Sequence, residues 1–425
     1  MELRGTSASS GARTAAARSF GGRQMRASLC ALVCLAGVGA DDAGIGTLQL
    51  VDQSAFPRAA CLDGSPPAFY FRPATTDAGR SKFLLYHEGG DFCGYGDTWE
   101  EWIEDCRQRA HTPLGSSRHL AANSTSDLYS SGVDAFARDP EALTFEWNWI
   151  YMMYCDGHYY AGANLSTTIA PVPNRSTTEE LFFRGRFNVE AVIGSVGLST
   201  SAPAPVPVTD VLVHGCSSGA VAVFSNADAV RAMLPTAARV AGAANSGYYL
   251  STHPEYTDYW TRPPYLMANL TASLSPACVQ SAASPWNCIV ADVAAPHIVS
   301  LPIFAWQSRY DSNQLSCVLI DPANVTAVNA YGDVLENSMR QWVREAEAPG
   351  FAGVPRGAFV DGCYRHCGCS SGITAGSWTP RTALASWWEG LWDASPATAN
   401  TSRIWSQNGE YYCKSCCTHP LPEIC

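Results

Sequence analysis

The segment that most constrains the fold of this chain runs from Asp210 to Ala220 and reads Asp-Val-Leu-Val-His-Gly-Cys-Ser-Ser-Gly-Ala. An apolar run enters a Gly-X-Ser-X-Gly pentapeptide, and a helix-like pattern follows as far as Pro235. The two glycines let the backbone turn sharply from strand to helix, which lifts the serine hydroxyl out of the sheet above a helix N-terminus. The segment therefore predicts a nucleophile elbow, with Ser217 as the nucleophile.

The same five-residue pattern occurs again from Gly368 to Gly372. No strand-like run precedes this copy, no helix pattern follows it directly, and cysteines surround it, so we interpret it as a disulfide-bound loop. The pattern alone is therefore a weak signal. The strand–turn–helix context is what favours Ser217 over a merely structural serine.

Strand-like and helix-like runs alternate along the rest of the chain. The strand-like runs are 69–71, 83–86, 149–153, 211–213 and 303–306, and the helix-like stretches are 99–109, 181–196, 220–234 and 334–346. Alternation of this kind predicts a mainly parallel sheet covered by helices, that is, an α/β-hydrolase-like three-layer α/β/α fold. We expect residues 41–425 to form one domain, in which residues 361–425 are a disulfide-stapled C-terminal region without clear periodicity.

A nucleophilic serine needs a base, and the base needs an acid that orients it. In α/β-hydrolases the acid and then the histidine follow the serine in the chain. Asp311 comes just after an apolar run, and His366 lies in a loop that Cys363 and Cys367 could hold in place; His297 and His419 are the other histidines at a useful distance. We predict Asp311 as the acid and His366 as the base. The alternatives are a turn or capping role for Asp311 and a surface position for His366.

An oxyanion hole is the remaining requirement. The apolar run from Lys82 ends in His-Glu-Gly-Gly-Asp, which resembles the glycine-rich loop that offers backbone N–H groups to an oxyanion. We predict the N–H groups of Gly90, Asp91 and Ser218 as the donors. The alternative is an ordinary glycine turn.

The composition indicates a folded, exported protein. The chain has 425 residues, 47% of them hydrophobic, and a net charge of −11, which argues against nucleic acid as a partner.

Residues 1–40 combine scattered arginines, an apolar run and a small-residue cleavage site, which predicts a secretory leader, with Met25 as a second candidate start. A plastid transit peptide and an uncleaved membrane anchor are the competing interpretations. No later run is long enough to span a bilayer. We expect the glycosylation sequons to lie at the surface; they are Asn123, Asn164, Asn174, Asn269, Asn324 and Asn400.

Cysteine usage also favours export. Of seventeen cysteines two fall in the leader, and the remaining fifteen predict a disulfide framework with at least one unpaired thiol. We expect Cys216 to be that thiol, because a disulfide is hard to place inside an elbow. Zinc binding by Cys363, Cys367 and Cys369, and by Cys413 and Cys416, is a weaker alternative because their spacing is irregular.

Several segments between residues 60 and 390 share their order and approximate spacing with one known family. They are Cys61-Leu-Asp-Gly-Ser-Pro-Pro-Ala-Phe-Tyr, His87-Glu-Gly-Gly-Asp-Phe-Cys with Cys106, Trp147-Asn-Trp with Tyr154-Cys-Asp-Gly, Phe183-Arg-Gly, Gly215-Cys-Ser-Ser-Gly, Tyr310-Asp-Ser and His366-Cys. Together they resemble the pectin acetylesterase / Notum-type carboxylesterase family. The resemblance implies an α/β/α serine hydrolase with a Ser217–Asp311–His366 triad and neither a metal nor another cofactor. It also implies acyl removal, commonly of acetate from cell-wall pectin, whereas animal relatives remove a lipid acyl group from a secreted signalling protein.

Three positions depart from the family pattern. Asp91 stands where the family usually has Gly or Trp, and a carboxylate that pointed inward there could repel the oxyanion. Ser218-Gly-Ala replaces Ala-Gly-Gly, and Asn245-Ser-Gly lies where the family usually has Ser-Asp-Ala-Gly. These departures affect the expected substrate and rate more than the triad.

The sequence therefore predicts a secreted, monomeric serine esterase that deacetylates a pectin-like extracellular polysaccharide through an acyl-enzyme. Since His366 must be neutral to act as the base, we expect activity to fall at acidic pH. Three alternatives remain open: a lipid-protein deacylase, a catalytically weak glycan-binding protein of the same fold, and a structural disulfide-rich secreted protein.

Overall fold

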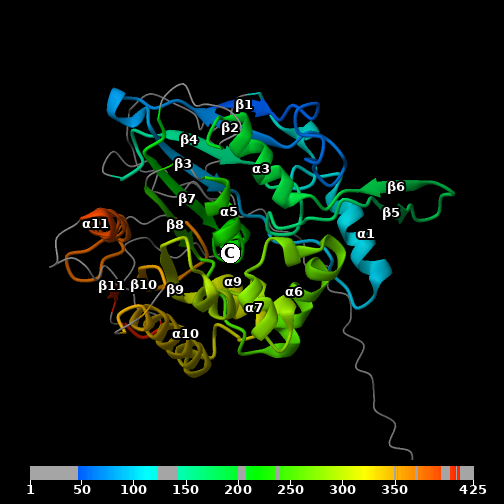
Figure 1. Ribbon diagram of the computed structural model, residues 1–425. Helices are drawn as coiled ribbons and strands as arrows, with labels where there is room; N and C mark the ends of the chain where they lie inside the picture. The colour runs from blue at the N-terminus through cyan, green and yellow to red at the C-terminus, as the bar shows by residue number, and fades with distance from the viewer. Residues whose placement is uncertain are drawn as a thin grey trace, which may run out of the picture.

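A mixed sheet with a parallel centre organises the chain. The computed structural model describes residues 46–122, 142–199, 207–234, 237, 239–348, 351, 353–368, 372–393, 403–407 and 409–411. Within these ranges the sheet has nine strands in the order β1-β2-β4-β3-β7-β8-β9-β10-β11 (Figure 1). β1–β2 and β2–β4 are antiparallel, and every later neighbouring pair is parallel. The predicted α/β fold with a mainly parallel central sheet is confirmed.

The strands of this sheet lie at β1 Thr47–Leu50, β2 Ala68–Arg72, β3 Lys82–His87, β4 Asn148–Met152, β7 Asp210–Cys216, β8 Arg239–Asn245, β9 Ile303–Asp311, β10 Arg356–Arg365 and β11 Arg403–Ser406. A separate antiparallel hairpin consists of β5 Thr168–Pro171 and β6 Thr178–Leu181. The helices are α1 Trp99–Arg109, α3 Gly185–Ser195, α4 Ser218–Ser225, α5 Ala227–Met233, α6 Pro254–Ala268, α7 Pro276–Ser281, α8 Ala291–Ala294, α9 Ser312–Cys317, α10 Val325–Glu345 and α11 Pro380–Trp392.

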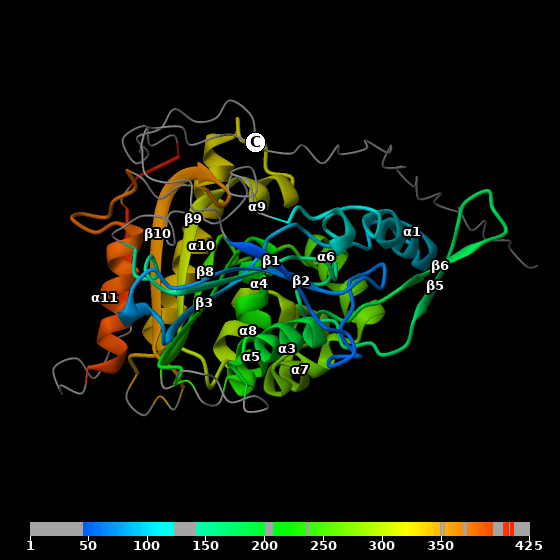
Figure 2. The same cartoon turned by 90° about the horizontal axis from the view of Figure 1, so that it is seen from above.

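Helices cover both faces of the sheet because its strands are apolar on both sides. Along β7, Val211 and Val213 pack into a core shared with α3, α4, α5 and α10, whereas Leu212 packs into a second core with Trp387 and Trp388 of α11. Successive side chains of a strand point to opposite faces, so a strand buried on both faces reads as a continuous apolar run. α11 and α4 accordingly lie on opposite sides of the strands in Figure 2.

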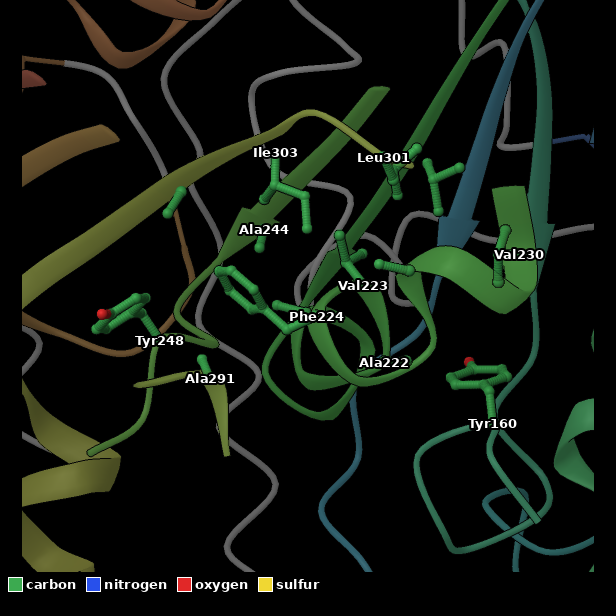
Figure 3. Close-up of a cluster of buried hydrophobic side chains, with 14 of the residues drawn as sticks. Tyr160, Ala222, Val223, Phe224, Val230, Ala244, Tyr248, Ala291, Leu301 and Ile303 are labelled. Atoms are coloured by element: carbon green, nitrogen blue, oxygen red, sulfur yellow. The ribbon is translucent and has the colours of Figure 1, made fainter. Parts of the chain in front are cut away.

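The larger core surrounds α4, the helix that begins at the predicted nucleophile. Its side chains Val223 and Phe224 point toward Leu301, Ile303 and Tyr248 in Figure 3. All eight residues of α4 are buried. The helix is thereby held firmly against the sheet, and this rigidity is what a catalytic residue at its N-terminus requires.

A third apolar cluster lies between α1, α6, α7 and the loop that follows β4, on the side of the molecule opposite α11 (Figures 1 and 2). Thr98 and Glu101 form a capping box that starts α1, and each satisfies a backbone N–H that the first helical turn leaves unpaired. Disulfides Cys93–Cys106 and Cys278–Cys288 lie in this cluster, and Cys61–Cys155 ties the strand ends beside it.

Several predicted boundaries are wrong for identifiable reasons. The stretch 181–196 contains the end of β6, and its helix begins only at Gly185. The stretch 220–234 is two helices, because the chain breaks at Asn226, whose side chain donates to the Tyr159 carbonyl at 2.9 Å. The last predicted helix, 334–346, begins earlier, at Val325, where the Asn324 side chain caps the N–H of Ala327.

The C-terminal region is more regular than its sequence suggests. β10 runs through Arg365, α11 begins at Pro380 under a Thr379–Thr382 capping box, and β11 adds the last strand of the sheet. The buried strands β8 and β10 have no counterpart among the predicted runs. β8 consists mostly of Ala and Gly, and the apolar residues of β10 are interrupted by Asp361 and two glycines, so both give a weak strand signal.

The predicted leader, Asn123, Asn400 and Ser370 lie outside the described residues. Among the other sequon asparagines, Asn174, Asn269 and Asn324 are exposed as predicted, and Asn164 is partly buried. A search of the described helices finds none with the length and apolar character that a membrane crossing requires.

Candidate active site

Ser217 occupies a sharp turn between β7 and α4. Its backbone has φ 58° and ψ −125°, a conformation that L-residues seldom adopt outside such elbows. The two glycines of the motif are required by space: a Cβ at Gly219 would lie 2.1 Å from the His87 carbonyl oxygen, and one at Gly215 would lie 2.5 Å from Gly219. The local geometry is that of the predicted elbow.

The elbow is tied to the neighbouring strand β8. The Ser217 N–H donates to the Asn245 carbonyl at 3.1 Å, and the Ser217 carbonyl accepts from the Val221 N–H at 2.9 Å. Gly247 follows β8, and a Cβ there would lie 2.4 Å from the Ala220 Cβ. The departure from the family pattern at residues 245–247 therefore lies directly against the elbow.

His366 and Asp311 complete a line of hydrogen bonds to the serine. The His366 Nε2 lies 2.9 Å from the Ser217 Oγ, and its Nδ1 lies 2.9 and 3.0 Å from the two carboxylate oxygens of Asp311. An ionised carboxylate can only accept, so Nδ1 carries the proton and Nε2 is left to accept from the serine hydroxyl. The structure thus brings together all three residues that the sequence proposed as nucleophile, base and acid.

Asp311 is fully buried at the end of β9 and also caps α9. Its carboxylate accepts from the N–H groups of Asn313 and Gln314 at 3.0 and 3.1 Å and from the Gln307 side chain at 3.0 Å. The capping role considered as an alternative is therefore present, and it is compatible with binding His366. These donors satisfy the oxygens of the buried carboxylate while it also binds His366.

A buried ion pair supports the loop that carries His366. The guanidinium of Arg365 binds the carboxylate of Asp361 at 2.5 Å and lies 4.0 Å over the Trp306 ring, whose Nε1 donates to the same carboxylate at 2.8 Å. Arg365 also donates to the Cys367 carbonyl at 2.7 Å, and the Cys367 N–H donates to the Ser246 Oγ at 2.9 Å. We did not foresee this network. The opposite charges four residues apart were its only signal in the sequence.

Cys216 is not the free thiol that we expected. It forms a disulfide with Cys367, whose Cα lies 6.0 Å away. This bond joins the residue before Ser217 to the residue after His366, across a sequence separation of 151. The expectation was wrong because the elbow presents Cys216 toward the adjacent loop, where ordinary disulfide spacing is available.

The other described cysteines are also accounted for. Cys363 and Cys367 are disulfide-bonded, so they are not the thiolate ligands that the zinc alternative needs. The sulfur atoms of Cys93 and Cys106 lie close to the His158 ring, but they too form a disulfide. Among the described residues Cys317 is the free cysteine, and burial raises the pKa of its thiol to about 12.

The predicted oxyanion loop is held from two sides. Arg109 donates to the Gly90 carbonyl at 2.6 Å, and the Ser218 Oγ donates to the Asp91 carbonyl at 2.9 Å. Both loop residues have positive φ, 147° at Gly90 and 64° at Asp91. In the described part of the chain, the N–H groups of Gly90, Asp91 and Ser218 donate to no protein acceptor. These are the three N–H groups that the sequence predicts as oxyanion donors.

The Asp91 carboxylate, which raised the question of oxyanion repulsion, has a partner. Its Oδ2 accepts from the Tyr95 hydroxyl at 2.6 Å. Asp105 in turn holds the Tyr95 segment by accepting from the N–H groups of Gly94 and Tyr95 at 2.9 and 3.2 Å. The charge of Asp91 is thus restrained by a chain of hydrogen bonds and does not move freely over the site.

We predict that Tyr95→Phe lowers kcat for 4-nitrophenyl acetate about fivefold, because the released Asp91 carboxylate can approach the developing oxyanion. Adding Asp91→Asn to the Tyr95→Phe variant should recover most of this loss, since the amide carries no charge. Steady-state kinetics of the single and double variants test the idea, and a double variant as slow as Tyr95→Phe alone contradicts it.

Two buried titratable groups lie at the end of β3, next to the oxyanion loop. Burial raises the pKa of Glu88 to about 7, although the Tyr154 N–H, which donates to Oε2 at 2.8 Å, acts in the opposite direction. Burial lowers the pKa of His87 to about 4, so this histidine is neutral at neutral pH. His87 and Glu88 are therefore both largely uncharged in mildly acidic solution, and the pair gains a negative charge as Glu88 ionises.

Glu88 should make the stability of the protein fall with rising pH. Its folded pKa of about 7 lies above the ordinary value of 4.5, so its contribution is fully present below pH 4.5 and is lost as pH rises through 7. We predict that Glu88→Gln, which cannot ionise, gains about 2 kcal/mol relative to the wild type between pH 5 and pH 8. Urea unfolding at both pH values measures this gain, and a pH-independent difference contradicts the assignment.

Comparisons with known proteins identify the family of this chain. A family model described as Pectinacetylesterase matches residues 40–383. Pectin acetylesterase 7 of Arabidopsis thaliana is 26% identical over 377 residues, which cover 85% of this chain and 86% of the plant protein. The palmitoleoyl-protein carboxylesterase NOTUM of Schmidtea mediterranea is 25% identical over 72% of this chain and 55% of its own length.

The solved structure of the Wnt deacylase Notum from Drosophila superimposes with a TM-score of 0.62 at 18% identity, over 87% of this chain and 98% of that one. At this identity the likeness shows a common fold. The family model covers most of the chain, and the curated relatives are carboxylesterases. This chain therefore belongs to the pectinacetylesterase family and is a carboxylesterase.

Proposed function

We propose that this carboxylesterase is a secreted serine hydrolase that removes acetyl groups from an extracellular polysaccharide. The observation that carries the proposal is the unbroken line of hydrogen bonds from the Ser217 Oγ through His366 to Asp311. Each residue has the partner that its role requires, and the three come from the C-terminal ends of β7, β9 and β10 in the parallel part of the sheet.

In the proposed mechanism His366 Nε2 takes the proton of Ser217 as the Oγ attacks the ester carbonyl. Asp311 holds the imidazole and stabilises the imidazolium that forms. The proton then passes from His366 to the leaving alcohol oxygen, which leaves an acyl-serine. Water, deprotonated by His366, attacks this ester, and collapse of the second intermediate releases the carboxylic acid and restores Ser217.

The negative charge of each tetrahedral intermediate falls on the former carbonyl oxygen. The N–H groups of Gly90, Asp91 and Ser218 are the proposed donors to this oxygen. The bonds that Arg109 and Ser218 make to the loop carbonyls orient the loop before substrate arrives, so little free energy is spent on reorganisation.

Polar side chains beside the nucleophile favour a short acyl group. Asp91 and Tyr95 are hydrogen-bonded to each other there. Tyr256 belongs to the same group of side chains, because burial, the Cys317 thiol and, more weakly, Asp91 raise the pKa of its hydroxyl. Tyr249 donates to Asn313 at 2.7 Å in the same region. A long aliphatic chain would displace water from these polar groups, which is costly, whereas acetate is small enough to avoid them.

The planarian and fly relatives, named for removing palmitoleoyl and Wnt acyl groups, support a lipid-protein deacylase as the second candidate. A comparison of 4-nitrophenyl acetate and octanoate separates the two. We expect kcat/KM for the acetate to exceed that for the octanoate at least tenfold. A preference for octanoate would favour the deacylase, and hydrolysis of neither ester would contradict a serine esterase and leave a glycan-binding protein.

Disulfides support the proposed export from the cytosol. Cys61–Cys155, Cys93–Cys106, Cys216–Cys367 and Cys278–Cys288 lie within the described residues. Such bonds form and persist in oxidising compartments. The predicted leader at residues 1–40 would provide the route.

A further inference from the structure

Exposed aromatic rings lie along the loop that follows the oxyanion residues. We call Tyr95, Trp99 and Tyr259 the aromatic rim; their exposed fractions are 39, 44 and 36%. The Tyr95 and Tyr259 ring centroids are 6.0 Å apart, and the Tyr259 hydroxyl accepts from the Gly96 N–H at 3.2 Å. The rim therefore connects the start of α1 to α6 and reaches the site through the bond between Tyr95 and Asp91.

The charges that accompany the rim are negative. Asp91 is exposed and is one residue from Gly90, while Asp97 and Glu100 are exposed in the same loop and first helical turn. The Asp91 backbone is fixed by Ser218 and its carboxylate by Tyr95, so this charge stays beside the nucleophile.

The arginines nearest to the site and the rim are engaged with other groups. Arg109 donates to the carbonyls of Gly90, Phe92 and Leu114, and Arg365 is paired with the buried Asp361. Arg262, the cation of α6, lies 5.7 Å over the Trp286 ring, and Asp258 accepts from the same indole. These cations keep their charge, but within the described residues none of them forms an ion pair with Asp91, Asp97 or Glu100.

From this arrangement, and resting on the proposed function, we propose that the site accepts acetylated glycans that are uncharged around the scissile ester and disfavours polyuronates. Aromatic faces suit the apolar faces of sugar rings, and carboxylates accept hydrogen bonds from sugar hydroxyls. A galacturonate carboxylate in the same position meets like charges instead.

The size of the discrimination follows from Coulomb's law. Two like charges about 5–7 Å apart in a medium close to water cost a factor of about three in binding, so two such pairs give about tenfold. The surface position of the rim makes this effect sensitive to salt, since the Debye length shrinks from about 30 Å at 0.01 M to about 3 Å at 1 M ionic strength.

A matched pair of polymers tests the proposal. One is acetylated polygalacturonate with free carboxylates, and the other is the same polymer with its carboxylates methyl-esterified. We expect acetate release from the neutral polymer to have a kcat/KM at least tenfold higher at 10 mM salt, and the ratio to approach one at 1 M salt. Asp91→Asn should lower the ratio at 10 mM salt at least threefold, whatever it does to the absolute rates.

Variants of Tyr259 test the aromatic part separately. Tyr259→Ala removes the ring and should raise KM for the neutral polymer about fivefold. Tyr259→Phe keeps the ring but removes the hydroxyl that accepts from Gly96, so it should behave like the wild type on the polymer. Equal KM increases in both variants would assign the effect to the loop bond instead of the ring.

A wild-type enzyme that hydrolyses 4-nitrophenyl acetate but treats the two polymers alike, or prefers the charged one, would overturn the charge selection. A wild-type enzyme that does not hydrolyse 4-nitrophenyl acetate at all would instead contradict the proposed function. The two failures are therefore distinguishable.

Discussion

Replacing Ser217 with alanine should lower kcat/KM for 4-nitrophenyl acetate by at least about 10³-fold. Without the Oγ no acyl-enzyme can form, and removal of the nucleophile alone costs a serine hydrolase about as much as removal of its whole triad. The same substitution should abolish labelling by a fluorophosphonate probe, which reacts with an activated serine. Because the bonds of Ser217 to the neighbouring elements run through its backbone N–H and carbonyl, the fold should survive the loss of the Oγ, and far-ultraviolet circular dichroism checks this.

The second copy of the motif provides a matched control. Ser370→Ala changes the serine in the same five-residue pattern at residues 368–372 and should leave both hydrolysis and labelling unchanged. Equal labelling of the wild type and Ser217→Ala, or loss of labelling in Ser370→Ala, would show that Ser217 is not the nucleophile.

Replacing Arg365 with methionine should cost about 3–5 kcal/mol in the free energy of unfolding. The Asp361 carboxylate is fully buried, and removing its partner leaves a charge that Trp306 and one backbone N–H satisfy only in part. Because Arg365 also holds the Cys367 carbonyl, the adjacent His366 should lose its fixed position. We expect kcat to fall about tenfold in the surviving folded protein, with a smaller change in KM.

Urea unfolding and steady-state kinetics measure these two effects. Arg365→Lys keeps a positive charge but not the planar donor group, so it should restore part of the stability and less of the kcat. If Arg365→Met were as stable as the wild type, the ion pair would not support the loop. A normal kcat at reduced stability would limit Arg365 to a structural role.

The disulfide Cys216–Cys367 illustrates a limit of sequence reasoning. Within the elbow Cys216 has no obvious partner, and its actual partner is 151 residues away. Pairing depends on the distance between Cα atoms, which the chain's spacing does not reveal. The same holds for the bond between Asp91 and Tyr95: the residues are close in sequence, but the direction of the carboxylate depends on the positive φ at Asp91.

The sequence by itself determined the elements whose cause is local. The elbow at Ser217 needs only a strand, two glycines and a helix, and Asp311 and His366 could be chosen by their order and by the strand end or cysteines beside them. Only the tertiary structure decided how these residues meet. The parallel order of β7, β8, β9 and β10 brings their C-terminal ends to one edge of the sheet, where His366 lies 2.9 Å from Ser217. The physical reason is that a hydroxyl, an imidazole and a carboxylate from distant segments align only when packing and sheet hydrogen bonds hold their strands in register.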